Sequence, residues 1–317
     1  YISSAFPQHK NRKRKHNRLI FVQINHHMKF LKNLLASVLG TFIAIVLSFV
    51  FLFILLAGIA SSIDTAEEVI VKENSLLTIS LQKPMTDRSP KQFEFEAAFD
   101  LDAEAVGLDK ILASIRSAKD DDRIEGISIE HTFLQSGMSQ TQAMRDALTD
   151  FKKSGKFIYA YHDYFTQKDY YLASVADSVF VHPEGGVELA GLASEVLYLK
   201  EFQDITGIEM QVIRSGAYKS AVEPFLQDEM SEKNREQIQS LLDSFWSEMV
   251  VKIEERAALT PKKINEIASS LDALVSANAV ELGVVDNAIL RNEYTELLRT
   301  KMELEEDDKL HTIDIED

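Results

Sequence analysis

The sequence contains no cysteine, so it has no disulfide framework, no cysteine nucleophile and no thiolate-ligated zinc site. It also lacks the H-E-x-x-H pattern of zinc peptidases, the G-x-S-x-G turn of α/β-hydrolases, and the glycine spacings that bind dinucleotides or nucleotide phosphates. The eight histidines are scattered, and their one adjacent pair, His26 and His27, lies in a basic amino-terminal stretch. These absences predict a protein with neither a metal ion nor a cofactor.

Basic residues are scarce everywhere except at the amino terminus. Residues 1–33 carry eight Lys or Arg and no acid, whereas the rest of the chain carries 26 bases against 50 acids. An acidic body repels phosphate backbones, so we expect no nucleic-acid partner. We expect the basic run at residues 10–18 to set the membrane topology of the chain. Binding of nucleic acid or of anionic lipid is the alternative role for this run. The first methionine is Met28, and one interpretation is that residues 1–27 are an over-extended reading frame.

Charged side chains are absent from residues 33–63. A membrane-spanning helix needs about 20 apolar residues, while the apolar core of a secretory signal has about 7–15. We therefore expect a retained anchor at 34–60, preceded by a basic cytoplasmic segment at 1–33 and followed by a linker at 61–75. The positive-inside rule then predicts that everything after the anchor lies on the periplasmic side of a bacterial inner membrane.

Beyond residue 75, short apolar runs alternate with amphipathic stretches. This alternation predicts repeated βαβ units with right-handed crossovers. Strands are expected at 75–82, 124–132, 156–165, 178–186 and 208–216. Helices are expected at 108–121, 139–155, 168–177 and 194–207, from Ser231 onward, and from Pro261 onward. Ser139 is the expected N-cap of the second helix, and Gly155 its stop. The acidic tail 299–317 is expected to be a linker or interaction tail.

One lysine, Lys219, stands among small and apolar neighbours in the stretch YKSAVEPF, residues 218–225. A lysine acts as a general base only when its amine is uncharged, and burial must first lower its pKa from the reference value of about 10.4. A neutral amine can then deprotonate a serine hydroxyl. The residues alone leave two other interpretations open, an ion pair with Glu223 and an ordinary solvated side chain. His162 and Asp163, adjacent at a strand end, do not make a triad by themselves because strand side chains alternate between faces.

The stretch at 218–225, followed by acids and a long helix containing Phe245-Trp246, resembles the signal peptide peptidase A family, also called protease IV. The match is to the amino-terminal half of the long, two-domain form, and it extends over roughly residues 76–290. The pieces IRSAKDDDRIEGISIE, FKKSGKFIYAY, YYLASVADSVFVHPEGGVELAGL and AVELGVVD agree in order. An amino-terminal anchor precedes them, as in the family.

The resemblance implies a crotonase-like (ClpP/crotonase) α/β spiral at 76–298 and a Ser/Lys-dyad peptidase. In this family the lysine base comes from the amino-terminal domain, which assigns that role to Lys219. The serine nucleophile and the oxyanion-binding N–H groups come from a carboxy-terminal domain. Here Gln167 stands where the nucleophile would be, and the glycine-rich oxyanion turn is reduced to Gly137. We therefore expect no peptidase activity from these 317 residues alone; activity would instead point to a local serine, Ser136 or Ser220.

The resemblance also implies peptide substrates, namely cleaved signal peptides, and a homo-oligomer that assembles with the nucleophile domain at a membrane. Two other functions stay open. One is an inactive, membrane-anchored adaptor or regulator with the same fold. The other is a crotonase relative that handles acyl-CoA, which the external location and the lack of a basic nucleotide site argue against.

Overall fold

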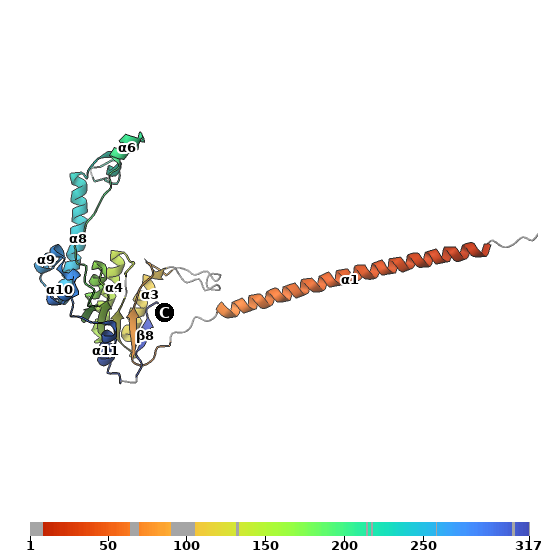
Figure 1. Cartoon of the computed structure of the whole chain (residues 1–317), viewed down its shortest axis with the longest axis horizontal. Coiled ribbons are helices and arrows are strands. Elements are labelled where there is room, and N and C mark those ends of the chain that lie inside the picture. Colours follow the sequence, from red (N-terminus) through yellow and green to blue (C-terminus); the bar gives the residue numbers. More distant parts are fainter. Residues whose placement is uncertain are drawn as a thin grey trace, which may run out of the picture. The chain divides into compact units, whose positions relative to one another are not determined.

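The computed structural model describes residues 9–63, 70–89, 105–130, 133–213, 215–216, 218–257, 259–305 and 308–316, with backbone only at 9–28 and 59–63. The chain forms two compact units, residues 1–68 with 92–102, and residues 69–91 with 103–317. In the first unit, helix α1 spans His9–Ile63 (Figure 1). Its segment Lys29–Gly58 has a mean hydropathy of 2.9 and is long and apolar enough to span a membrane.

The second unit is built on a six-stranded, all-parallel sheet with the order β7-β6-β5-β4-β1-β8. The strands are β1 (Ser75–Ile79), β4 (Ile124–Ile129), β5 (Phe157–His162), β6 (Ser178–Val181), β7 (Asn287–Ala288) and β8 (His311–Asp314). A second, two-stranded sheet pairs β2 (Met85–Thr86) with β3 (Val106–Gly107). The predicted α/β class with a parallel sheet is confirmed.

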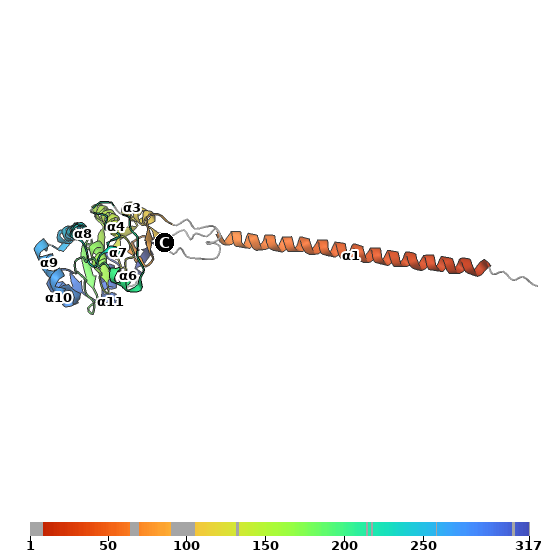
Figure 2. The same ribbon diagram turned by 90° about the horizontal axis from the view of Figure 1, so that it is seen from above.

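Helices connect and cover the strands of this unit. They are α3 (Leu108–Asp120), α4 (Met138–Phe151), α5 (Gln167–Ala173), α6 (Lys200–Thr206), α7 (Glu223–Leu226), α8 (Glu232–Ala257), α9 (Pro261–Ser270), α10 (Ser276–Glu281) and α11 (Arg291–Lys301). Two 3-10 turns, η1 (Lys152–Ser154) and η2 (Asp272–Leu274), extend the set. Figure 1 shows α9 and α10 near the lower end of α8, and Figure 2 shows all three helices on the same side of the body.

The core lies on both faces of the sheet because the strands alternate their side chains. In β1, Leu77 and Ile79 join the larger apolar cluster, which includes buried residues of α3, α4, α8 and α9. Leu76 points to the opposite face, where it packs in a smaller cluster with Tyr294 and Leu298 of α11. Burial on both faces explains the nearly continuous apolar composition of the central strands.

Three local expectations differ from the structure. The N-cap of α4 is Gly137 rather than Ser139, and Gln140 completes the cap by accepting the Gly137 N–H at 2.8 Å. Within 194–207, only Lys200–Thr206 is helical, and residues 208–213 are not a strand. Among the residues that the structure describes, no strand pairs with residues 208–213, so their backbone is irregular.

The acidic tail also contains structure that its composition hides. Part of the segment expected as a linker, residues 299–317, is strand β8, which pairs in parallel with β1. Ile315, directly after β8, is 5% exposed and packs in the larger core cluster. The amino-terminal part of the expected linker at 61–75 includes residues 64–69, which lie outside the described residues.

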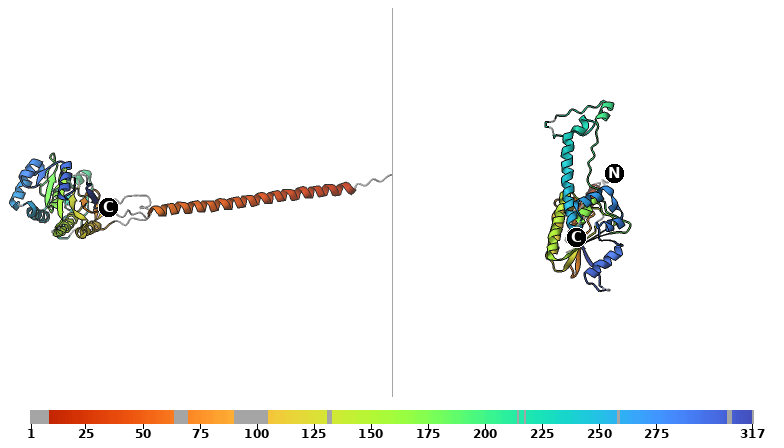
Figure 3. Two further views of the ribbon diagram at one scale, coloured as in Figure 1. Left: turned by 90° about the horizontal axis from the view of Figure 1, so that it is seen from below. Right: turned by 90° about the vertical axis from the view of Figure 1, so that its left-hand side faces the viewer.

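A long excursion, which we call the arm, leaves the sheet after residue 190 and returns along α8. Figure 1 shows α8 running from the body to α6, and Figure 3 shows the ascending segment beside α8. The 26 residues of α8 make it about 39 Å long. The spacing of its apolar residues predicts one stripe, formed by Ile238, Leu241, Leu242, Phe245, Met249 and Ile253. The stripe is buried at Met249 and Ile253, whereas Leu241 and Phe245 are exposed.

Candidate active-site residues

Lys219 lies at the tip of the arm. Its N–H donates to the Gly216 carbonyl at 3.3 Å, and Gly216 adopts a φ of +99°, which favours glycine. The Lys219 side chain is exposed, and within the described part of the chain its amine has no ion-pair partner. In the single chain, therefore, no apolar wall covers this amine, and a second surface would be needed to do so.

A buried carboxylate holds the arm tip together. Glu223 is 1% exposed and accepts hydrogen bonds from Ser231 Oγ at 2.6 Å and Asn234 Nδ2 at 3.1 Å. Ser231 immediately precedes α8, so the carboxylate also sits at the amino-terminal end of that helix, where negative charge is favoured. Because the Glu223 N–H donates to Ser220 O at 2.9 Å, the same network fixes the turn that carries Lys219.

Ser220 and Ser136, the two serines considered as alternative nucleophiles, lie at different distances from Lys219. Ser220 is the next residue in the chain and is half-buried. Ser136 belongs to the body, where its Oγ hydrogen-bonds with Thr141 Oγ1 at 2.7 Å. The stretch of α8 between the tip and Met249, the first buried residue of its stripe, is about 25 Å long. The Lys219 amine therefore cannot reach Ser136 within one chain.

Gln167 occupies the first position of α5, at the carboxyl end of the parallel sheet. Its Oε1 accepts from the N–H groups of both Ala190 and Gly191, at 2.9 and 2.8 Å, and its Nε2 donates to Gly191 O at 2.9 Å. A carboxamide is not a nucleophile, and this one is held in place by three hydrogen bonds. This geometry agrees with the expectation that this half of the family's fold carries no nucleophile.

Lys168 is a residue that the sequence did not single out. Its Nζ donates to Ser136 O at 2.6 Å, and burial lowers the pKa of its ammonium group. Beside it, Asp169 is fully buried and accepts from Leu134 N at 3.0 Å and Thr166 Oγ1 at 2.6 Å. These bonds fix the loop before α4. The Gly137 N–H, which an oxyanion would need, is occupied by Gln140.

His162 and Asp163 serve separate local contacts. His162 Nδ1 accepts from the Tyr164 N–H at 3.2 Å, and Asp163 Oδ1 accepts from Tyr161 Oη at 3.5 Å. Asp163 is exposed, whereas His162 is buried at 4% exposure, so the interpretation of the pair as surface polar residues holds only for Asp163.

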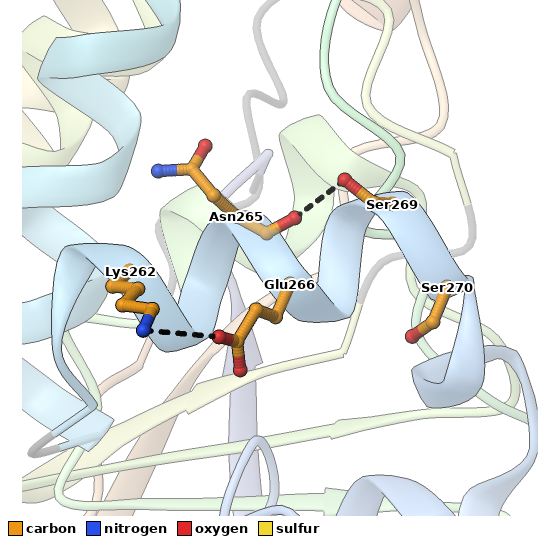
Figure 4. A pocket seen from close by; sticks show the side chains of 5 residues that line it. All are labelled: Lys262, Asn265, Glu266, Ser269 and Ser270. Carbon is orange, nitrogen blue, oxygen red and sulfur yellow. Dashed lines mark hydrogen bonds and ion pairs between the residues drawn. The ribbon is translucent and has the colours of Figure 1, made fainter.

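A hollow of about 590 Å³ lies over α9 (Figure 4). Its lining residues are Lys262, Asn265, Glu266, Ser269 and Ser270. Lys262 and Glu266 pair with each other at 3.9 Å, and Ser269 Oγ donates to the Asn265 carbonyl at 2.8 Å. One helix face supplies all five side chains, so the hollow brings no groups from different elements together and offers no constellation for catalysis.

Comparison with known proteins gives consistent relatives. A family model, Peptidase family S49, matches residues 150–305. Protease 4 of Haemophilus influenzae is 27% identical over 280 residues, covering 84% of this chain and 46% of that protein. Protease 4 of Salmonella typhi is 34% identical over 168 residues, covering 52% and 27%. Serine protease SPPA, chloroplastic, of Arabidopsis thaliana is 28% identical over 246 residues, covering 77% and 35%.

The match over residues 150–305 shows that this part of the chain is similar to peptidase family S49, and the parallel α/β body is consistent with that similarity. The names of the relatives support the signal peptide peptidase A (protease 4) family and confirm the resemblance drawn from the sequence. The chain spans less than half the length of these curated relatives.

Proposed function

We propose that this chain is the base-supplying half of a membrane-anchored serine peptidase of the signal peptide peptidase A type. Its body at 76–298 is the amino-terminal, crotonase-like domain, and α1 is the anchor that holds it on the periplasmic side of a bacterial inner membrane. Its substrates are apolar peptides such as cleaved signal peptides. The observation that carries the proposal is Lys219, which is fixed at the arm tip by the Glu223 network yet left uncovered by its own chain.

The reaction divides its groups between two domains. A serine Oγ from a carboxy-terminal domain attacks the peptide carbonyl while the uncharged amine of Lys219 takes the hydroxyl proton. Lys219 then gives that proton to the leaving amine, and water hydrolyses the acyl-enzyme. Backbone N–H groups of the second domain stabilise the oxyanion. Docking of that domain, or of a further copy in a homo-oligomer, excludes water from the Lys219 amine.

The exposed apolar side chains of the arm support this assembly. Ile205, Ile208 and Ile213 are 77%, 58% and 103% exposed. An apolar patch of this kind marks an interaction surface. A covering surface would bury these side chains together with Lys219, which lies on the same tip.

The test is hydrolysis of a fluorogenic apolar peptide in detergent. The 317-residue chain alone should show no turnover, and a longer form with a serine-bearing domain should be active. Lys219→Ala in the longer form should lower kcat by about 10²–10⁴-fold. Lys200→Ala, which removes another partly exposed lysine of the arm, is the matched control and should leave kcat unchanged. Turnover by the chain alone that Lys219→Ala abolishes would overturn the proposal.

The second candidate is an inactive adaptor, favoured by Gln167 at the nucleophile position. It predicts that no serine-bearing domain yields Lys219-dependent turnover. The same assay therefore separates the two functions.

A further inference from the structure

The backbone at Ala190 and Gly191 forms a small nest for an oxygen atom. Two successive N–H groups converge on one atom, Gln167 Oε1, at 2.9 and 2.8 Å. Gly191 has a φ of +79°, a left-handed conformation that favours glycine. Consecutive N–H groups arranged in this way bind anions and carbonyl oxygens.

The group in the nest has the chemistry of a peptide bond. The Gln167 carboxamide offers one carbonyl oxygen to the nest and one N–H group to Gly191 O, at 2.9 Å. Gly191 thus exchanges both of its backbone hydrogen bonds with one amide, as paired residues do in an antiparallel ladder. One residue of an extended peptide presents its own N–H and C=O on the same side of the chain, so it could make the same three bonds.

A groove continues from the nest between the ascending segment of the arm and the helices α8 and α9. Its volume is about 280 Å³. Apolar side chains of Leu192, Leu242 and Trp246 line it, and Asp243 supplies a carboxylate. Ala190 and Leu192 are exposed, so the groove opens to solvent along the edge of the ascending segment. These lining residues can pack against an apolar side chain of an extended peptide and pair with a neighbouring positive charge.

We propose that the Ala190–Gly191 nest and this groove form a second, non-catalytic binding site for an extended peptide, and that the Gln167 carboxamide closes it. The site differs from the peptidase centre because Lys219 lies at the far end of the arm. The Gln167 carboxamide and the peptide compete for the same N–H and C=O groups of the nest. A peptide must displace Gln167, so its apparent affinity is lowered by the fraction of molecules that are closed.

The test measures peptide binding rather than hydrolysis. The probe is a fluorescein-labelled octapeptide of Leu, Ala and Lys, followed by fluorescence anisotropy with the full chain in detergent micelles. Gln167→Ala and Gln167→Ser remove the closing amide. Each variant should lower the apparent Kd at least about tenfold, because three hydrogen bonds to Gln167 no longer compete. Gln237→Ala, an exposed glutamine of α8, is the matched control and should leave the Kd unchanged.

Two further binding measurements define which features of the peptide are recognised. A backbone N-methylated octapeptide of the same composition keeps its carbonyl oxygens but cannot donate to Gly191 O, so its Kd should fall less in Gln167→Ala than the Kd of the parent peptide does. Adding Asp243→Asn to Gln167→Ala should weaken binding of the lysine-containing peptide but not of a peptide with Lys replaced by Gln. If the N-methylated peptide gains as much affinity as the parent peptide, recognition of the peptide backbone is contradicted.

The outcome is independent of the peptidase proposal. The affinity gain should persist in Lys219→Ala, which removes the catalytic base and leaves the nest intact. The proposal is overturned if both Gln167 variants keep the helical content and thermal midpoint of the parent chain and still bind the peptide no more tightly.

Discussion

Glu223 accepts a hydrogen bond from Asn234 at 3.1 Å across the turn that separates α7 from α8. The two residues lie on either side of the segment in which the arm reverses direction, close to Lys219. A carboxylate that is 1% exposed makes this contact the main polar link within the arm tip. The position of the candidate base therefore depends on a buried acid four residues further along the chain.

Replacing Glu223 with Ala should loosen the tip without unfolding the body. The loss of hydrogen bonds leaves Ser231 and Asn234 without their acceptor and costs about 1–3 kcal/mol locally. Hydrogen exchange should accelerate in residues 218–236, while the sheet strands keep their protection. Glu229→Ala, an exposed acid of the same turn, should change neither region. Equal exchange in Glu223→Ala and the parent chain would show that the carboxylate does not hold the tip.

Arg145 should be a main determinant of how α8 is held on the body. Its guanidinium donates to Lys252 O at 3.1 Å and Tyr171 O at 3.3 Å, and it lies 5.5 Å from the centroid of the Tyr171 ring. Arg145→Ala should lower the free energy of unfolding by about 2–4 kcal/mol, because buried carbonyl groups lose their donors and a void remains. Urea denaturation measures this change. Arg116→Ala, at an exposed site of α3, should stay within about 0.5 kcal/mol of the parent.

Alkaline pH should destabilise the body through Tyr170. Burial raises the pKa of this phenol to about 12, and its hydroxyl donates to Val284 O at 2.6 Å. The unfolded side chain titrates near pH 10, so between about pH 10 and 12 the unfolded state binds fewer protons and the free energy of unfolding falls as pH rises. The Tyr170 contribution is fully present below pH 10.

Tyr170→Phe provides the comparison for this pH effect. At pH 8 the variant should be less stable than the parent, by about 1 kcal/mol for the lost hydrogen bond. The gap should shrink or reverse by pH 11, because phenylalanine does not titrate. A gap that is constant from pH 8 to pH 11 in urea titrations would rule out Tyr170 as the titrating group.

Helix α1 should anchor the chain through its Lys29–Gly58 segment. The double substitution Val46→Asp and Leu47→Asp places two charges near its centre, at a cost of about 2.5–3.5 kcal/mol each. The protein should then leave the membrane pellet after alkaline carbonate extraction. The conservative pair Val46→Leu and Leu47→Ile should remain in the pellet, and loss of both variants from the pellet would exclude a specific effect of charge.

The sequence predicts the body well because its signals are local and its partners lie in the same chain. Strands β4 and β5 are six-residue segments rich in isoleucine and aromatic residues, and α9 begins at Pro261 as expected. Prediction fails where the outcome depends on a neighbour. The sequence predicts a strand at 208–216, but residues 208–213 pair with no strand in the described part of the chain. Strand β8 is hidden in an acidic tail because only its pairing with β1 makes it a strand.

The candidate site likewise contains one residue that the sequence predicts and several contacts that it does not. Lys219 is found from its motif, since residue types and order carry that signal. The contacts of Lys168 and Gln167 are not found, because they join residues that are 23 to 32 positions apart in the chain. Hydrogen bonds between separate loops depend on tertiary structure, and no periodicity or composition indicates them.

The role of Lys219 as base can be tested by chemical rescue, since a chain with no cysteine allows selective alkylation at one introduced thiol. Lys219→Cys, assembled with the serine-bearing domain, should be inactive toward the fluorogenic peptide. Treatment with 2-bromoethylamine converts the thiol into a lysine analogue with the amine at nearly the same reach. The account predicts that this treatment restores turnover. Turnover that is unaffected by Lys219→Cys, or not restored by complete alkylation, would contradict it.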